Sequence, residues 1–158
     1  MDPNAKKTAL RMLPYGLYVL TADGPSGTGA ATVNWVTQAS FAPPLVAVGV
    51  KTDSHVHAII KETGAFALNV LGKGQQALAF TFFKPAELKD GKISGEAFKA
   101  GTTGAPILAS TPAYVECTLE STGIARPLYL ALGYRRTGPE RPGFGLSICY
   151  PMAKQILA

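Results

Sequence analysis

The sequence predicts a mainly β protein, an antiparallel barrel or sandwich with a few short helices. Roughly six or seven runs of strand length follow one another along the chain, with two or three short helical stretches. The strands come in succession and do not alternate regularly with helices, which disfavours a doubly wound parallel sheet. The 17 glycines and 12 prolines are typical of a chain with many strands and turns.

The overall composition indicates one globular unit, which we expect to span residues 1–158. Apolar residues make up 47% and charged residues 16%, proportions of a chain that buries a core. The net charge of +5 is compatible with ordinary solubility or with attraction to an anionic ligand such as a phosphate or dinucleotide. Basic residues are dispersed along the chain apart from pairs such as Arg135-Arg136, so no nucleic-acid partner is predicted.

The N-terminus is not expected to be a signal peptide. Its first residues, MDPNAKK, are polar, and no apolar run approaches the ~18–20 residues that a membrane span needs. We therefore expect a cytoplasmic protein without membrane association. The two cysteines, Cys117 and Cys149, form no CxxC motif, and Cys117 is predicted to be a small core residue, although a disulfide between them stays open.

The N-terminal segment predicts a short helix. Asp2 can cap it, Pro3 suits its first position, and it runs to about Leu13 with Leu10, Met12 and Leu13 packing inward.

The other elements follow in order along the chain. We expect a turn over 22–29, an irregular loop or lid over 86–105 anchored by Phe98, and a helix C-terminal cap at Gly64. The expected strands are 16–21, 31–36, 45–50, 66–71, 104–108, 113–120 and 127–136, and the expected further helices are 55–62 and 75–83. Residues 145–150 could form a last strand and 152–157 a helical tail.

The stretch Ala31–His57 organises the rest of the chain. Two predicted strands are joined by a Pro-Pro turn, and a polar loop then opens a helix. On the first strand, Ala31, Val33 and Trp35 share one face, and Thr32, Asn34 and Val36 share the other.

The second strand of this stretch, Leu45–Val50, is apolar on both faces and fits a buried central strand. In the loop, Lys51 brings a positive charge to a helix start that Ser54 can cap, which predicts a phosphate site.

Three motifs, two in this stretch and one shortly after it, resemble the flavin reductase-like family of FMN-binding split β-barrels. They are Ala31–Gln38 (ATVNWVTQ), Ser40–Val48 (SFAPPLVAV) and Gly64–Leu71 (GAFALNVL). The resemblance covers about residues 8–120. It implies an antiparallel split β-barrel with short flanking helices, non-covalently bound FMN, and a homodimer with flavin near the interface.

An FMN site needs donors or a cation for the phosphate, polar groups for the ribityl chain and a flat apolar slot for the ring. Lys51, Asp53, Ser54 and His57 are candidates for the phosphate, and Thr32, Asn34 and Ser40 for the ribityl chain and ring. Val33, Trp35 and Val36 could supply backbone contacts and a wall. The resemblance places these same positions at FMN, and it suggests that Phe82-Phe83 closes over the flavin from the same or a partner subunit.

Each candidate also has a purely structural interpretation. Trp35 alone is more often a core residue, Lys51 a solvated strand end, and Asn69 a residue that satisfies a strand edge. His55 and His57 cannot share a helix face, so no metal site is predicted. No GxSxG, Walker or GxGxxG signature points to a nucleophile or a Rossmann site, and we name no catalytic residue.

The chain departs from the family pattern after Thr118. The family usually shows Gly-Asp-His there, whereas this chain keeps only Gly123 and lacks the Asp and His. Arg126 or Arg135 could replace the histidine as a cation for a dinucleotide phosphate.

Several functions therefore stay open. The first is an NAD(P)H:flavin oxidoreductase that passes hydride from NADH or NADPH to FMN and serves an electron acceptor or monooxygenase. The second is an FMN-binding electron carrier without efficient NAD(P)H oxidation. A related split barrel for another ligand, similar to pyridoxamine phosphate oxidase, and a structural or nucleic-acid-binding barrel are the remaining alternatives.

Overall fold

The computed structural model confirms a mostly antiparallel β architecture with a few helices. The structure describes residues 2–42 and 44–119 in full, and beyond them only the backbone of short strands. These later strands are β11 (Ser121–Thr122), β12 (Tyr134–Arg136), β13 (Arg141–Pro142), β14 (Ile148–Tyr150) and β15 (Met152–Lys154). Within the described part, the strands form separate sheets and no closed barrel.

A four-stranded antiparallel sheet of order β10-β5-β1-β2 forms the centre of the molecule. Its strands are β1 (Tyr18–Gly24), β2 (Gly27–Val33), β5 (Ala65–Val70) and β10 (Ala113–Thr118). β1 and β2 pair from Tyr18↔Val33 to Gly24↔Gly27, so the turn is shorter than the one expected over 22–29. Gly27 takes a φ of 107°, which favours glycine.

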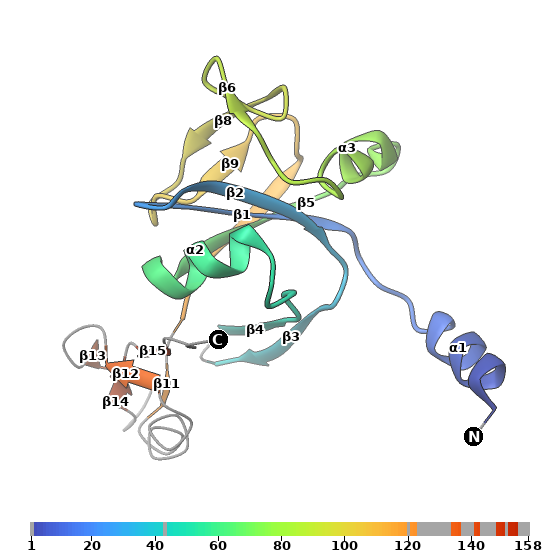
Figure 1. Cartoon of the computed structure of the whole chain (residues 1–158). Coiled ribbons are helices and arrows are strands. Elements are labelled where there is room, and N and C mark those ends of the chain that lie inside the picture. Colours follow the sequence, from blue (N-terminus) through green and yellow to red (C-terminus); the bar gives the residue numbers. More distant parts are fainter. Residues whose placement is uncertain are drawn as a thin grey trace.

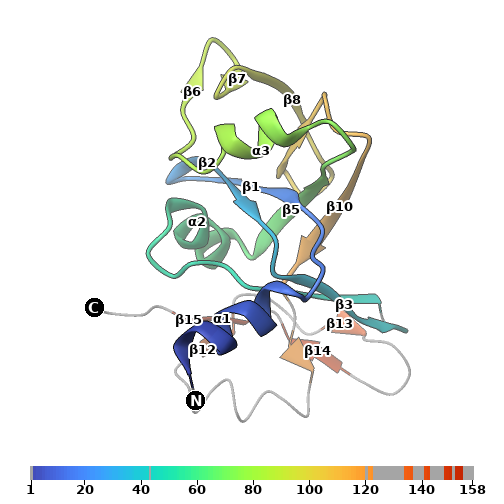
Figure 2. The same ribbon diagram turned by 90° about the vertical axis from the view of Figure 1, so that its right-hand side faces the viewer.

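Both faces of this sheet are covered, because successive β1 residues point to opposite sides. Leu20 packs with Val56 and Ile59 of α2 (His55–Thr63), whereas Val19 packs with Phe82 and Leu108 on the other side. Figures 1 and 2 show the sheet between α2 on one side and α3 (Gln76–Thr81) with the second sheet on the other. The near-continuous apolar runs in β1 and β5 fit strands that are buried on both faces.

Asn69 fastens the central sheet to the second sheet. Its side chain is fully buried, and its Nδ2 donates to the Val19 carbonyl (3.1 Å) and to the Thr21 hydroxyl (3.0 Å). Its Oδ1 accepts the Leu108 N–H at 2.8 Å. The residue therefore does more than satisfy a strand edge, because it joins β1, β5 and β9.

The second sheet has the order β6-β7-β8-β9 and replaces the irregular loop expected over 86–105. Its strands are β6 (Leu88–Lys89), β7 (Lys92–Ile93), β8 (Glu96–Ala100) and β9 (Pro106–Leu108). The pairs Asp90-Gly91 and Ser94-Gly95 all take positive φ, as two-residue type I′ turns require. These turns make a regular meander of very short strands. Phe98 packs against the core, as predicted.

A two-stranded hairpin, β3 (Val36–Phe41) and β4 (Pro44–Val48), projects from the centre. The expected buried strand over 45–50 is wrong: β4 ends at Val48, and Leu45 and Val46 are 47% and 38% exposed. Phe41 at its tip is 86% exposed. No third strand joins this hairpin within the described residues, so its apolar side chains face outward.

The N-terminal helix α1 (Pro3–Arg11) begins as expected, because the Asp2 carboxylate accepts the N–H groups of Asn4 (3.0 Å) and Ala5 (3.3 Å). The predicted inward packing is wrong. Leu10, Met12 and Leu13 are 53%, 79% and 51% exposed, and α1 stands apart from the sheets (Figure 1).

The structure tests only part of the predictions made for residues beyond Leu119. β12 and β14 lie within the strands expected over 127–136 and 145–150, and the rest of those ranges lies outside the described residues. Where a helix was expected over 152–157, β15 is a strand, because it pairs with β12. Cys117 is half-buried against the core as predicted, and the Cys149 side chain lies outside the described residues.

Candidate functional site

Two loops meet at the base of the β3–β4 hairpin. One is the break at Asn34–Trp35 between β2 and β3, and the other follows β4 at Gly49. The Gly49 N–H donates to the Trp35 carbonyl at 2.8 Å. A Cβ at Gly49 would lie 3.2 Å from Trp35 Cβ and 3.3 Å from its Cε3, so glycine lets the indole rest against the backbone. The purely structural interpretation of Trp35 as a core residue is wrong, since it is 66% exposed.

The start of α2 lies a few residues beyond Gly49. Ser54 caps it as predicted: its Oγ accepts the His57 N–H (3.4 Å) and donates to the Lys51 carbonyl (2.6 Å). The N–H groups of His55 and Val56 have no acceptor within the helix, because they belong to its first turn. The C-terminal cap at Gly64 is also confirmed, with a φ of 69°.

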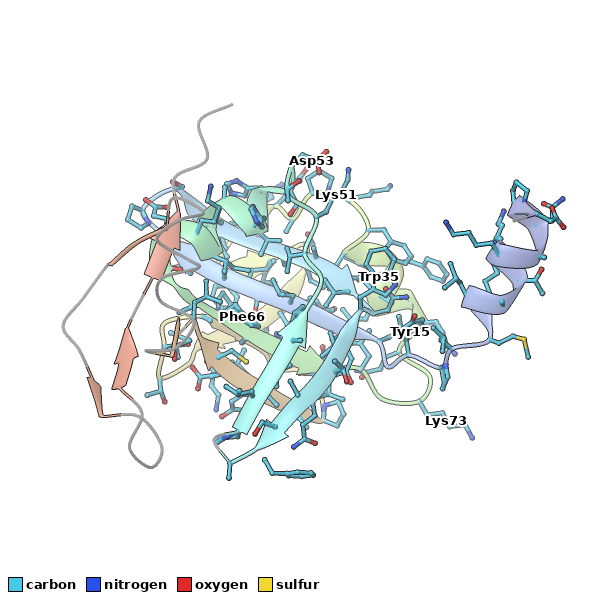
Figure 3. The ribbon with its side chains drawn as sticks, turned by 90° about the horizontal axis from the view of Figure 1, so that it is seen from below. Tyr15, Trp35, Lys51, Asp53, Phe66 and Lys73 are labelled. Atoms are coloured by element: carbon cyan, nitrogen blue, oxygen red, sulfur yellow. The ribbon has the colours of Figure 1, made fainter. Side chains whose placement is uncertain are left out.

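The charges at this helix start are partly compensated. Lys51 and Asp53 form an exposed ion pair at 3.1 Å, visible in Figure 3, and the hydrogen bond from Lys51 lowers the pKa of Asp53. Partial burial, with the nearby charge of Lys61, lowers the pKa of His57 below its ordinary value of 6.5. His57 is therefore neutral at pH 7 and offers a phosphate a hydrogen bond, not a full positive charge.

A groove of about 1130 Å³ lies between α1 and the base of the hairpin, and we call it the α1 groove. Figure 3 shows Tyr15 and Trp35, both in its lining, near each other on the side toward α1. No acidic side chain lines it within the described part of the chain. Its lining consists of Pro3, Lys6, Lys7, Leu10, Arg11, Leu13, Tyr15, Asn34, Trp35, Val36, Thr37, Ala47, Val48 and Gly49.

The predicted site residues fall into separate groups. Asn34, Trp35 and Val36 line the α1 groove, whereas Lys51, Asp53, Ser54 and His57 lie at the start of α2. The Val33 side chain is buried in the core, so this residue can offer a ligand its backbone only.

Two predicted contacts lie on other parts of the structure. Thr32 fastens α3 to β2, because its hydroxyl donates to the Ala79 carbonyl (2.6 Å) and its N–H to the Phe82 carbonyl (3.0 Å). Ser40 lies near the hairpin tip, four residues along β3 from Val36 and thus about 13 Å away.

The aromatic pair that ends α3 is divided between core and surface. Phe82 is buried, whereas Phe83 is 63% exposed and packs edge-on against Phe80, with ring centroids 5.5 Å apart. Phe83 is therefore the member of the pair that is free to meet a ligand or a partner, and it lies next to Thr32 through the Phe82 carbonyl.

Sequence reasoning missed the contribution of α1. The residues Pro3, Lys6, Lys7, Leu10 and Arg11 follow the spacing i, i+3, i+4, i+7 and i+8, which places them on one helix face. That spacing was readable in the sequence. It was overlooked because this face is basic and not apolar, so it does not show the pattern of a packed helix.

Comparison with known proteins identifies the family of the chain. Residues 10–132 match the family model described as Flavin reductase like domain. The chain belongs to this family. It is 33% identical over 122 residues to diflavin flavoprotein A 1 of Synechocystis sp., covering 77% of this chain and 21% of that protein. It is 29% identical over 118 residues to the FMN reductase (NADH) RutF of Pseudomonas syringae, covering 75% of this chain and 66% of that protein.

Solved structures of flavin reductases share the fold of this chain. The styrene monooxygenase flavin reductase of Pseudomonas putida S12 superposes with a TM-score of 0.61 at 25% identity, covering 94% of this chain and 81% of that one. The chain spans only about a fifth of the length of the diflavin flavoproteins that it matches. In the described residues, no helix is long and apolar enough to cross a membrane.

Proposed function

We propose that this protein is an NAD(P)H:flavin oxidoreductase that binds FMN non-covalently at the base of the β3–β4 hairpin. The observation that carries the proposal is the junction of Trp35 and Gly49. At this junction, the exposed indole and the Asn34 side chain lie beside the segment that leads into the start of α2. A flat aromatic ligand with a phosphate tail needs these features close together.

The residues present fit FMN in their donor chemistry. At α2, the first-turn N–H groups and the Ser54 hydroxyl would hold the phosphate, with Lys51 as a nearby cation. Asn34 would bind the ribityl chain or the ring edge, and Trp35 would form a wall that excludes water. When bound, the flavin supplies the redox chemistry, which is acceptance of a hydride from reduced nicotinamide and release of both electrons to an acceptor.

We further propose that the protein works as a homodimer and supplies reduced flavin to a monooxygenase. The outward-facing Phe41, Leu45 and Val46 at the hairpin tip support a second copy, since apolar side chains gathered on a projecting hairpin need cover. The flavin reductase of styrene monooxygenase supports a partner of that class. Ser40 and Phe83, which lie apart from the other candidates, would then act at the interface.

The alternative is an FMN-binding electron carrier. It is favoured by one observation, the absence of Asp and His from the segment after Thr118 where the family carries Gly-Asp-His. The diflavin flavoproteins, of which this chain matches only a fifth, also leave room for electron transfer within a larger protein.

Anaerobic titration of the FMN-loaded protein with NADH and NADPH separates the two functions. Rapid bleaching of the flavin absorption band is expected for the reductase. A protein that stays yellow with both nucleotides and bleaches with dithionite is a carrier, and the reductase proposal is then wrong.

The position of the FMN site is tested by the double variant Asn34→Ala/Ser54→Ala. We expect its FMN affinity to fall at least about tenfold, since two hydrogen bonds to the ligand are lost. Folding should lose only about 1 kcal/mol, the usual cost of removing a helix cap such as Ser54. Unchanged FMN affinity in the folded variant would show that the site lies elsewhere.

A further inference from the structure

The α1 groove carries a charge pattern that packing does not explain. Three of the five α1 residues that face it are cations, Lys6, Lys7 and Arg11, and α1 buries no residue at all. A helix stabilised by its contacts turns an apolar face inward. Here the face toward the groove carries three cations, and the aromatic side chains of Tyr15 and Trp35 line the same groove.

We propose that α1 binds the pyrophosphate of the nicotinamide dinucleotide. This inference rests on the proposed function, because it assigns a binding site to the hydride donor beside the flavin. A pyrophosphate carries two negative charges, and the Arg11 guanidinium and the two lysine ammonium groups can donate charge-assisted hydrogen bonds to it. Tyr15 and Trp35 offer faces on which a planar base can stack.

The size of the α1 groove agrees with a dinucleotide. Its volume of about 1130 Å³ exceeds the roughly 300–1,000 Å³ usual for small-molecule sites. Asn34 and Trp35 line it and also belong to the proposed FMN site, so the groove is continuous with the place where the flavin ring would lie. A nicotinamide could thus meet the flavin while its pyrophosphate contacts α1.

A second copy of the chain is a poorer occupant of this groove. The hairpin sequence from 36 to 48 contains no Asp or Glu, so the hairpin of a partner would bring no negative charge to the three cations. The exposed apolar side chains Phe41, Leu45 and Val46, moreover, lie toward the hairpin tip and do not line the groove. The hairpin tip therefore suits a protein partner, whereas the α1 groove at the foot of the hairpin suits an anion.

The test uses ADP-ribose, which has the pyrophosphate and adenosine of the dinucleotide but no nicotinamide. Its affinity for the FMN-loaded full chain is measured by calorimetry in the wild type and in the variant Lys6→Gln/Lys7→Gln/Arg11→Gln. We expect binding to weaken at least about tenfold, since even one lost bond to a charged group has roughly that effect. The variant should keep its melting temperature, because α1 has no buried residue.

A matched control removes three exposed lysines away from the groove, as Lys73→Gln/Lys89→Gln/Lys92→Gln. It changes the net charge equally, so its ADP-ribose affinity should stay within about twofold if the effect is local. Equal affinity in the α1 variant and the wild type, or equal loss in the control, would overturn the proposal. So would a change of molecular mass by light scattering in the α1 variant with unchanged affinity, which would make α1 a subunit contact.

The outcome also separates this inference from the proposed function. If NADH bleaches the flavin and the α1 variant binds ADP-ribose normally, the pyrophosphate site is wrong and the reductase stands. If the wild type binds ADP-ribose through α1 but neither NADH nor NADPH bleaches the flavin, the reductase function fails and the anion site stands.

Discussion

Replacing Asn69 should destabilise the protein more than replacing any exposed polar residue. In Asn69→Ala, the buried Leu108 N–H loses the Oδ1 that accepts it at 2.8 Å, and the Val19 carbonyl and Thr21 hydroxyl lose their shared donor. A buried donor without an acceptor costs about 1–3 kcal/mol, and the space left by the amide adds to this. We therefore expect a loss of about 3 kcal/mol in the free energy of unfolding, or roughly 6–12 °C in Tm for a chain of this size.

The variant Asn69→Asp tests the polarity of the same site. One carboxylate oxygen can still accept the Leu108 N–H, but the other faces the Val19 carbonyl and can only donate to it when protonated. The folded-state pKa of the new carboxyl is therefore raised above its unfolded value of about 3.9. The folded state binds the extra proton, so the variant should be most stable below about pH 4 and lose stability as the pH rises toward 7.

The assay is urea unfolding of the full chain followed by fluorescence of Trp35, with circular dichroism as a second probe. Asn34→Ala serves as the matched control, since Asn34 is exposed and should change stability by no more than about 0.5 kcal/mol. A loss below about 1 kcal/mol in Asn69→Ala, or no pH dependence of the Asn69→Asp destabilisation between pH 4 and 7, would refute the role assigned to this side chain.

Three further predictions concern residues of the central sheet. In Gly29→Ala, the new Cβ would lie 3.0 Å from the Val56 Cα, so α2 must shift and stability should fall by about 1–3 kcal/mol in thermal unfolding. In Thr32→Val, the hydroxyl bond to the Ala79 carbonyl of α3 is lost, and the amides of α3 should exchange with solvent roughly tenfold faster. The Thr103 N–H and hydroxyl, each 2.8 Å from Glu116, lower its pKa. Glu116→Gln should therefore be destabilising at pH 7, with the difference shrinking as the pH falls below about 4.3; a difference independent of pH would contradict this.

Local signals in the sequence predicted the elements whose ends are fixed by local chemistry. Asp2 and Ser54 cap helices because their side chains reach the backbone a few residues on, and Gly64 ends α2 because it tolerates a left-handed conformation. The meander from β6 to β9 was missed although its signal is also local. The dipeptides Asp90-Gly91 and Ser94-Gly95 specify type I′ turns, but the strands between them are too short to show an apolar period.

The positions of the hairpin and of α1 could not be predicted, for a different reason. Apolar runs such as Leu45–Val48 indicate that a surface will be covered, but they do not say whether the cover comes from the same chain. The proposed site was predictable in part, because the motifs around Asn34 and Ser54 marked the two groups of residues that it combines. The contact between Trp35 and Gly49 depends on the length of the hairpin between them, and the basic face of α1 has no apolar periodicity to reveal it.

The projecting hairpin also links ligand affinity to protein concentration. A two-stranded hairpin is at best marginally stable in water by itself, and Asn34 and Trp35 lie at the base of this one. In the proposed homodimer, association would order the hairpin and with it one wall of the flavin site, so by mass action each equilibrium would strengthen the other. Dilution should then release flavin and subunits together, and added flavin should hold dilute protein in its associated form.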